Sequence, residues 1–516
     1  MSTAHAEAAG DDPPTLRIST VAGTGVAGCA GDGELAVLAQ LNHPNGIAVD
    51  SAGAVYVADY GSHRVRKITA DGKIATFAGT GVAQYRGDSN LAAASPLNGP
   101  RGLTLDSAGA LYIADAGNQL IRKVPAGGTD SGRMCRVAGV GGMGARTPGF
   151  GGDDGPAASA QLNRPMELAV DGDGVLYVAD FGNHRVRKIT ADGKISTVAG
   201  TGAAGFAGDG GPAASARLNR PYAVAVDGEG VLYVADAGNH RVRKITADGK
   251  ISTVAGTGAA GFAGDGGPAA SAQLNRPMGL VVDSTGVLYV ADYDNHRVRR
   301  ITADGTISTV AGTGAAGFAG DDGPPASAQL NHPLGLAVDG AGVLYISDAD
   351  NHRVRKVAPV RAGLPDSGMV VSWANVRSRL RMGVLRESTK DGAEIHQSLA
   401  TSRNHQRWRL VVVGQDDGGV WYRIENVRSG KVLEVAGAQE AAGAVVAQRV
   451  YEGTDASHQQ WRLNPVGSAS GPSRVYEIAN RNSGLLLRVD TNARTAIKQH
   501  GAEGDHRDRL WQLLPV

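Results

Sequence analysis

Short apolar runs separated by glycine-rich polar stretches recur along the first two thirds of the chain. In one stretch, residues 168–171 are nearly all apolar, and a Gly-containing turn separates them from a second apolar run at 175–180. Residues 185–189 then alternate polar and apolar side chains, and a fourth run follows at 195–200. Such runs predict β-strands, the first buried on both faces and the third half-buried. The pattern therefore predicts units of four short strands.

The four-strand unit repeats around the tripeptide Val-Ala-Gly or a variant of it. The first residues of these tripeptides are Val21, Phe77, Val137, Val198, Val254 and Val310. The intervals are 56, 60, 61, 56 and 56 residues. Four-stranded sheets repeated radially are typical of a β-propeller. The unit resembles the NHL repeat in its N-x-P opening and its V-D-x-x-G, Y-V-A-D and N-H-R motifs, and this resemblance covers residues 16–358.

Ring closure is also predicted by the repeat. The last unit ends near residue 357 without a fourth strand, whereas the chain opens with such a strand at 17–23. We expect the N-terminal strand to complete the last blade, which removes an exposed sheet edge and gives six blades. Residues 1–15 are then expected to form a flexible N-terminus.

A second, threefold repeat follows a Pro- and Gly-containing linker at 359–368. Its anchors are Gln406-Arg-Trp408, Gln459-Gln-Trp461 and the degenerate Arg509-Leu-Trp511, about 50 residues apart. These Q-x-W motifs resemble the ricin-B β-trefoil over residues 369–516. The predicted fold class is therefore all-β, with a six-bladed β-propeller followed by a C-terminal β-trefoil.

The ricin-B resemblance implies that each Q-x-W tryptophan is core and that an acid near the start of each lobe receives sugar hydroxyls. Alignment on the interior glutamines places Gly383, Glu434 and Arg488 at that position. Only the second lobe keeps an acid, and its aromatic position reads Val450. The predicted carbohydrate-binding residues, all in lobe two, are Glu434, Gln448, Tyr451, His458 and Gln459.

The propeller repeats differ from one another mainly at one set of loops. These positions follow the motif proline or lie in the turn between the second and third strands. The candidate residues of this face are Asn45, Tyr60, Arg101, Met166, Glu167, Phe181, Tyr222, Met278 and Tyr293. A variable loop face on a constant scaffold predicts binding of a protein, peptide or glycan.

Four repeated histidines resemble a metal ring. They are His184, His240, His296 and His352. Because they sit on third strands, far from the channel, they cannot converge on one ion. We expect them to pack with the repeated aspartates instead, and we predict no metal ligands among them.

Recognition without catalysis is the favoured function, with a carbohydrate-binding trefoil attached to a propeller interaction scaffold. The alternative is a metal-dependent propeller hydrolase or lyase at the channel mouth, with the trefoil as its targeting module. Calcium near Glu167 belongs to that alternative, although calcium normally takes six to eight oxygen ligands. The nearly identical blades suit a scaffold better than an asymmetric active site, so we otherwise expect no cofactor.

Bulk composition excludes several partners. The net charge of +1 gives no reason to expect nucleic acid. The two cysteines form no disulfide framework, and no run of apolar residues is long enough to span a membrane. The N-terminus has no readable signal peptide. We therefore expect a cytoplasmic protein, or an extracellular one if another route exports it.

Overall fold

The chain folds into two compact units, Met1–Pro359 and Val360–Val516. The structure, a computed structural model, describes residues 16–515 except 71, 128–131, 141–147, 360–367, 402, 417–418, 454–455, 467–473, 490–495 and 502–508. The predicted flexible segment 1–15 and residues 360–367 of the predicted linker lie outside the described residues. Among the described residues, secondary structure consists of strands and short 3₁₀ turns, and no helix could cross a membrane.

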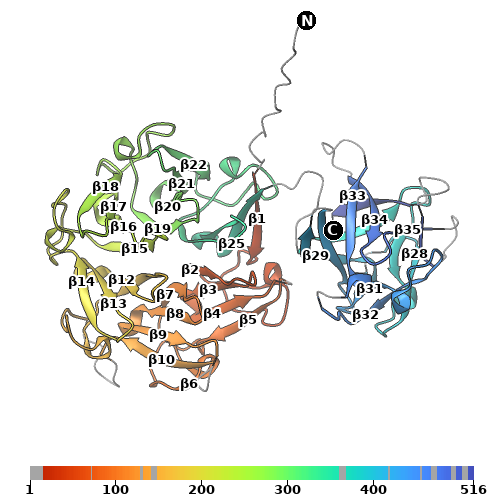
Figure 1. Ribbon diagram of the computed structural model, residues 1–516, viewed down its shortest axis with the longest axis horizontal. Coiled ribbons are helices and arrows are strands. Elements are labelled where there is room, and N and C mark those ends of the chain that lie inside the picture. The colour runs from red at the N-terminus through yellow and green to blue at the C-terminus, as the bar shows by residue number, and fades with distance from the viewer. Residues whose placement is uncertain are drawn as a thin grey trace, which may run out of the picture. The chain divides into compact units, whose positions relative to one another are not determined.

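The first unit is a propeller of six antiparallel sheets arranged around one axis (Figure 1). Blade one contains β2 (Pro44–Val49), β3 (Val55–Asp59), β4 (Arg64–Ile68) and β5 (Ile74–Ala78). Blade two contains β7 (Pro100–Leu105), β8 (Leu111–Asp115), β9 (Leu120–Val124), β10 (Arg133–Ala138) and the additional β6 (Asn90–Leu91). Blade three contains β11 (Pro165–Val170), β12 (Leu176–Asp180), β13 (Arg185–Ile189) and β14 (Ile195–Ala199).

The other three blades follow the same order. Blade four contains β15 (Pro221–Val226), β16 (Leu232–Asp236), β17 (Arg241–Ile245) and β18 (Ile251–Ala255). Blade five contains β19 (Pro277–Val282), β20 (Leu288–Asp292), β21 (Arg297–Ile301) and β22 (Ile307–Ala311). Blade six contains β23 (Pro333–Val338), β24 (Leu344–Asp348), β25 (Arg353–Pro359) and β1 (Leu16–Ala22). The predicted six-bladed propeller is therefore confirmed.

Strand β1 is the outermost strand of blade six. It pairs antiparallel with β25, from Leu16 opposite Pro359 to Ala22 opposite Val354. The first described strand and the last strand of the propeller thus share one sheet, and backbone hydrogen bonds close the ring.

Six 3₁₀ turns follow the second strands: η2 (Tyr60–Ser62), η4 (Ala116–Asn118), η6 (Phe181–Asn183), η8 (Ala237–Asn239), η10 (Tyr293–Asn295) and η12 (Ala349–Asn351). Six more lie in the glycine-rich loops: η1 (Ala36–Leu38), η3 (Ala92–Ala94), η5 (Ala157–Ser159), η7 (Ala213–Ser215), η9 (Ala269–Ser271) and η11 (Pro325–Ser327). Because the first set connects equivalent strands, the six turns recur at equivalent positions around the ring.

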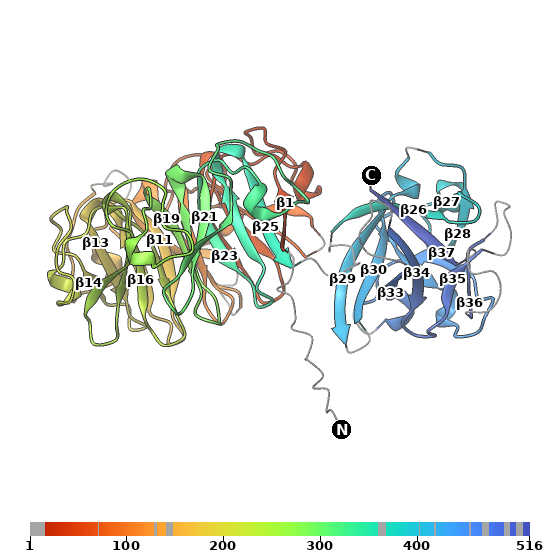
Figure 2. The ribbon, with the colours of Figure 1, turned by 90° about the horizontal axis from the view of Figure 1, so that it is seen from above.

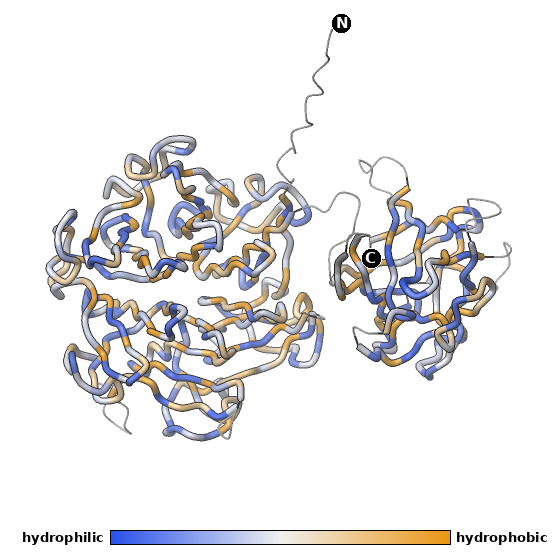
Figure 3. Tube along the Cα trace, in the orientation of Figure 1, coloured by the Kyte–Doolittle hydropathy of each residue, from blue (hydrophilic) through white to orange (hydrophobic). Residues whose placement is uncertain are grey.

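The propeller core lies between neighbouring blades. For example, Ala223 and Ala225 of blade four pack in one cluster with Leu280, Val290 and Ile301 of blade five. Small residues on one sheet opposite branched residues on the next let the sheets approach closely. Hydrophobic and hydrophilic segments are interspersed along the propeller (Figure 3).

The third strand of each blade departs from the predicted alternation, because the arginine at its third position is buried. Arg187 is fully buried and pairs with Asp180 at 3.3 Å and with Asp153 of the glycine-rich loop at 2.6 Å. The equivalent buried arginines are Arg66, Arg122, Arg243, Arg299 and Arg355. A buried cation requires such partners, so each arginine also fastens a glycine-rich loop to its blade. The ring centre of Phe150, in the same loop, lies 4.9 Å from the guanidinium carbon of Arg187.

The second unit is a β-trefoil built on one twelve-stranded sheet (Figure 2). Its strands are β26 (Val370–Asn375), β27 (Arg381–Val384), β28 (Ala393–Ser398), β29 (Trp408–Asp416), β30 (Gly419–Asn426), β31 (Val432–Val435), β32 (Val446–Arg449), β33 (Trp461–Pro465), β34 (Arg474–Asn480), β35 (Leu486–Arg488), β36 (Lys498–His500) and β37 (Leu510–Pro515). Its 3₁₀ turns are η13 (Leu385–Glu387), η14 (Asn404–Gln406), η15 (Ala436–Ala438) and η16 (Ser457–Gln459).

The three anchor tryptophans are core residues, as predicted. Trp408, Trp461 and Trp511 are fully buried in one cluster. Their indole N–H groups donate to the carbonyls of Met382, Leu433 and Leu487 at 3.1, 2.9 and 3.0 Å, respectively. A buried indole N–H needs an acceptor, and each lobe supplies one at the same place.

Candidate ligand-binding face of the propeller

The variable positions gather on one face because of strand register. In blade three the motif proline, Pro165, lies opposite Asp180, the last residue of the second strand. The loop before the inner strand and the turn after the second strand therefore emerge at the same end of the blade. We call this end, with its six proline loops and the turns η2, η4, η6, η8, η10 and η12, the loop face.

The repeated aspartates build this face. Asp180 accepts the backbone N–H of Asn163 at 2.8 Å through Oδ1 and the side-chain amide of Asn183 at 2.8 Å through Oδ2. The carboxylate thereby ties the proline loop to the turn within one blade. All six aspartates accept the corresponding backbone N–H, so the scaffold of the face is constant while its other side chains vary.

Three of the predicted residues meet at the channel mouth. Tyr222 of blade four donates its hydroxyl to Oδ1 of Asn45 in blade one at 3.1 Å. Arg101 of blade two donates to the Tyr222 hydroxyl at 3.0 Å, and its guanidinium lies 3.8 Å from the ring centre of Tyr60. Asn45 and Tyr222 are buried, so this network joins three blades beneath the loop face.

An apolar group surrounds the network. Met166, Tyr222, Met278 and Leu334 are buried in one cluster, and Phe181 and Tyr293 pack against it. Above them lies a hollow of about 290 Å³. Its lining comprises His43, Tyr60, Arg101, Arg164, Met166, Phe181, Tyr222, Arg276, Met278, Tyr293 and Leu334. The structure thus brings together most of the predicted face residues in one concave site.

The predicted sugar-binding set of the trefoil lies inside its lobe. Glu434 is 1% exposed and accepts hydrogen bonds from Arg449 at 2.8 Å and from Gln459 at 3.3 Å. His458 approaches the same carboxylate at 3.7 Å. The ring centre of Tyr451 lies 4.8 Å from the guanidinium carbon of Arg423. The geometry therefore assembles Glu434, Gln459 and His458 but leaves their polar atoms engaged with the protein.

Gln448 has a structural role that recurs in all three lobes. Its Oε1 accepts the hydroxyl of Ser429 at 2.7 Å, and its Nε2 donates to the carbonyls of Ser388 and Lys390. Gln397 and Gln499 accept from Ser378 and Ser483 in the same way. Because lobes one and three lack the acid yet keep this contact, the glutamine holds a turn in every lobe.

Family comparisons agree with this architecture. The profile described as NHL repeat matches residues 41–68, 274–301 and 330–357, and that of the teneurin NHL domain matches 82–190 and 196–261. The profile described as ricin-type beta-trefoil lectin domain-like matches 363–449 and 406–503. The chain joins an NHL-repeat propeller to a ricin-type trefoil.

The relatives that match the propeller include proteins longer than this chain. Teneurin-4 of Mus musculus is 29% identical over 346 residues, which is 61% of this chain and 12% of the teneurin. NHL repeat-containing protein 2 of Gallus gallus is 31% identical over 296 residues, 51% of this chain and 39% of that protein. The chain therefore spans less than half the length of either relative.

A solved structure of a Bacteroides thetaiotaomicron protein of unknown function also resembles the chain. Its TM-score is 0.51 at 20% identity, covering 67% of this chain and 76% of that one. This likeness concerns the fold alone.

Glu167 lies on the wall of the NHL propeller's channel, a space of about 230 Å³ formed by the inner strands. Among the described residues lining it, Glu167 is the only ionisable one. Desolvation raises the pKa of Glu167 to about 8, whereas nearby N–H groups and Arg101 oppose the shift. One carboxyl group alone supplies fewer oxygen ligands than the six to eight that calcium normally takes.

The repeated histidines of the NHL propeller join neighbouring blades, rather than packing with the aspartates as predicted. His184 has a left-handed backbone, with φ 52°, and its Nδ1 accepts the N–H of Arg220 in the next blade at 3.0 Å. In blade two Gln119 replaces the histidine and accepts the N–H of Arg164 through Oε1. The repeated aspartates instead bind asparagine and arginine side chains, as Asp180 binds Asn183 and Arg187, and so they are not paired with the histidines.

Charge is unevenly distributed around the loop face. Blades three, four and five place Arg164, Arg220 and Arg276 immediately before the motif proline. On the other side, Asp350 bridges two histidines, His43 at 2.7 Å and His332 at 2.5 Å. Asp350 is not among the residues predicted from the sequence. One feature of the sequence could have identified it. In blade six the turn reads Asp-Asn-His, whereas four other blades have Gly in place of this aspartate.

Proposed function

We propose that the chain is a non-catalytic recognition protein whose principal ligand surface is the hollow on the loop face. The observation that carries this proposal is convergence: residues that differ between nearly identical blades meet in one concave site of about 290 Å³. Aromatic and arginine side chains are the residues most enriched at binding hot spots. Variable side chains on a constant scaffold are also the usual arrangement of a recognition loop face.

The lining of the hollow indicates the kind of ligand. Tyr60, Phe181 and Tyr293 supply aromatic faces, on which sugar C–H surfaces or peptide side chains stack. Arg164 and Arg276 add cations that bind carboxylates. A glycan, peptide or protein segment with an apolar body and an acidic group therefore fits this site best.

A propeller hydrolase or lyase has less support. Its centre would be Glu167, which is the only ionisable residue among the described residues that line the channel. Among the described residues, no group of three or more His, Cys, Asp or Glu is arranged to hold a metal ion. No contact among the described residues specifically favours catalysis over binding.

Carbohydrate binding by lobe two of the trefoil is a second proposal. It is supported by a preorganised cluster in which Arg449 and Gln459 fix the Glu434 carboxylate. The Arg449 side chain is 44% exposed at the surface end of this cluster, and the adjacent Val450 is 57% exposed. Sugar hydroxyls would meet guanidinium donors there, beside a small apolar platform.

A glycan and peptide array probed with the intact protein tests both proposals. Arg164→Glu reverses a charge in the hollow, and Arg300→Glu is its control at an exposed position of β21 in blade five. Binding weakened at least tenfold by the first variant alone supports the propeller site. Binding weakened by Glu434→Gln alone assigns the ligand to the trefoil. A bound ligand that neither variant affects contradicts both assignments.

A further inference from the structure

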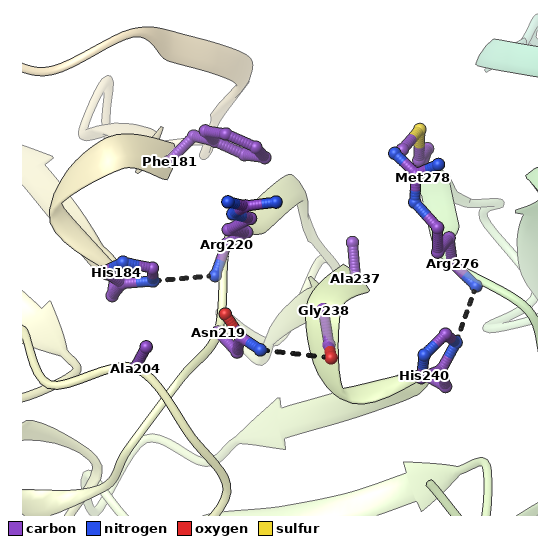
Figure 4. A pocket seen from close by; sticks show the side chains of 10 residues that line it. All are labelled: Phe181, His184, Ala204, Asn219, Arg220, Ala237, Gly238, His240, Arg276 and Met278. Carbon is purple, nitrogen blue, oxygen red and sulfur yellow. Dashed lines mark hydrogen bonds between the residues drawn. The ribbon is translucent and has the colours of Figure 1, made fainter. Parts of the chain in front are cut away.

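A second pocket opens on the loop face around the turn of blade four (Figure 4). Its volume is about 480 Å³, within the range of small-molecule sites. Residues from three blades line it, including Phe181, His184, Arg220, Ala237, His240 and Arg276. It shares Phe181, Arg276 and Met278 with the hollow, but Arg220 lines only this pocket and Arg164 lines only the hollow.

The pocket exists because the turn of blade four carries small residues. Ala237 stands where the neighbouring turns carry Phe181 and Tyr293, and Gly238 stands where blade five carries Asp294. Figure 4 shows Ala237 and Gly238 between the two arginines. The turn of blade four, with its small residues, thus lies between two turns that carry aromatic side chains. An open space remains above Ala237.

Arginines from two blades flank this space. Within the described part of the chain Arg220 has no ion pair, and its guanidinium lies 6.0 Å from the ring centre of Phe181. Arg276 reaches Asp294 only at 3.5 Å, and its side chain is 49% exposed. None of the described lining residues is acidic. The pocket therefore carries positive charge that the protein does not neutralise within it.

Two histidines add hydrogen-bond donors. Nδ1 of His184 accepts the N–H of Arg220 at 3.0 Å, and Nδ1 of His240 accepts the N–H of Arg276 at 3.2 Å. A ring nitrogen that accepts a hydrogen bond carries no proton, so each neutral ring has its proton on Nε2. Burial lowers the pKa of both histidines, which favours this neutral donor form.

We propose that this pocket binds the anionic group of an organic sulfate or phosphate ester. Guanidinium groups match tetrahedral oxyanions through paired N–H donors, and imidazole N–H groups add single donors. The volume exceeds that of the anion alone, and Phe181 and Met278 offer apolar contact to the organic part. The inference rests on the proposed role of the loop face but uses a different cavity and a different arginine.

Calorimetry on the intact protein at low ionic strength tests the proposal, because salt screens exposed charges. The probes are glucose 6-phosphate, inorganic phosphate and glucose. The variants are Arg220→Ala and the control Arg164→Ala. Both arginines precede a motif proline and have a φ of 53°, so the substitutions place similar demands on the backbone.

We expect glucose 6-phosphate to bind, glucose not to bind, and Arg220→Ala to weaken binding at least tenfold while Arg164→Ala changes it less than twofold. Tighter binding of glucose 6-phosphate than of inorganic phosphate identifies an ester ligand, whereas equal binding identifies the free anion. Absence of binding by both phosphates, or equal binding by wild type and Arg220→Ala, overturns the proposal. Array binding that depends on Arg164 would still support the hollow in that case.

Discussion

Tyr222 of blade four donates its hydroxyl to Oδ1 of Asn45 in blade one, across the mouth of the channel. The two atoms are 3.1 Å apart, and the residues are 177 positions apart in the sequence. Arg101 donates to the same hydroxyl from blade two. These residues differ from their counterparts in other blades, so part of the asymmetry of the propeller lies in this network. Side-chain hydrogen bonds between blades thus hold the floor of the hollow, and preorganisation of this kind lowers the entropy lost when a ligand binds.

Tyr222→Phe should destabilise the propeller by about 1–2 kcal/mol, because it leaves a buried amide oxygen of Asn45 and a donor of Arg101 without this partner. Urea unfolding followed by far-UV circular dichroism measures the change. Tyr233→Phe is the control, since its hydroxyl reaches Asp227 only at 3.4 Å on a partly exposed hairpin. Equal stability of the two variants would refute the role given to the network.

Histidine protonation should destabilise the propeller as the pH falls. Burial lowers the pKa values of four inter-blade histidines, His63, His184, His240 and His296. A lowered folded-state pKa contributes stability above the unfolded pKa of about 6.5 and loses it as the pH falls through the folded value. The stabilisation from these four histidines should therefore decline as the pH falls from 7.5 to 5.5. Melting temperatures measured across this range follow the decline.

Replacing these four histidines by glutamine isolates that contribution. Gln119 already serves as the acceptor in blade two, with the same left-handed backbone. Buried aspartates such as Asp180, whose pKa burial raises to about 6, stabilise the fold in the opposite direction as the pH falls, but they are common to both proteins. The quadruple variant should lose less stability than wild type on acidification. Parallel melting curves across this pH range would exclude the histidine contribution.

Arg187→Met should destabilise the propeller by about 3–5 kcal/mol, because it leaves the buried Asp180 carboxylate without its cation. The loop contact to Asp153 is lost as well. Lys188→Met, on the same strand but half-buried, should change the free energy of unfolding by less than about 0.5 kcal/mol. Thermal unfolding of both variants measures the difference. If Arg187→Met lowers the free energy of unfolding no more than Lys188→Met does, the buried ion pair does not stabilise the propeller.

Glu434→Ala should destabilise the trefoil by about 2–3 kcal/mol, because a buried acceptor of charge-assisted hydrogen bonds disappears. All five tryptophans lie in this unit, so tryptophan fluorescence of the intact protein follows its unfolding alone. They are Trp373, Trp408, Trp421, Trp461 and Trp511. Glu440→Ala, at an exposed position, is the control. An unchanged unfolding midpoint for Glu434→Ala would mean that the carboxylate does not stabilise the trefoil.

Periodicity was sufficient to predict both folds. The interval between Val-Ala-Gly tripeptides defines the blade, and the spacing of the Q-x-W motifs defines the lobe. Residues near the motif prolines, such as Met166 and Tyr222, could be placed at the channel mouth because strand register is the same in every copy. Repetition within one chain thus supplied the comparison from which variable positions were recognised.

Contacts that depend on distant partners could not be predicted in this way. Arg187 looked exposed because alternation assigns polar residues to the solvent face, and its partner Asp153 comes from a loop 34 residues earlier. Glu434 looked available because nothing in the motif reveals that Arg449 and Gln459 occupy its oxygens. The pocket near Arg220 depends on two small residues, Ala237 and Gly238. Small residues carry no reactive group, so their positions in the sequence do not indicate a binding site.

The pairing of β1 with β25 has a consequence for the order of events on the ribosome. Leu16 emerges early, but its partner Pro359 is made 343 residues later, roughly 20–70 s at ordinary translation rates. Blades one to five hold their own strands and can form as they emerge, whereas β1 must wait with its edge unpaired. The ring therefore closes last, and the interval before closure is when the nascent chain is most open to misassembly with another strand edge.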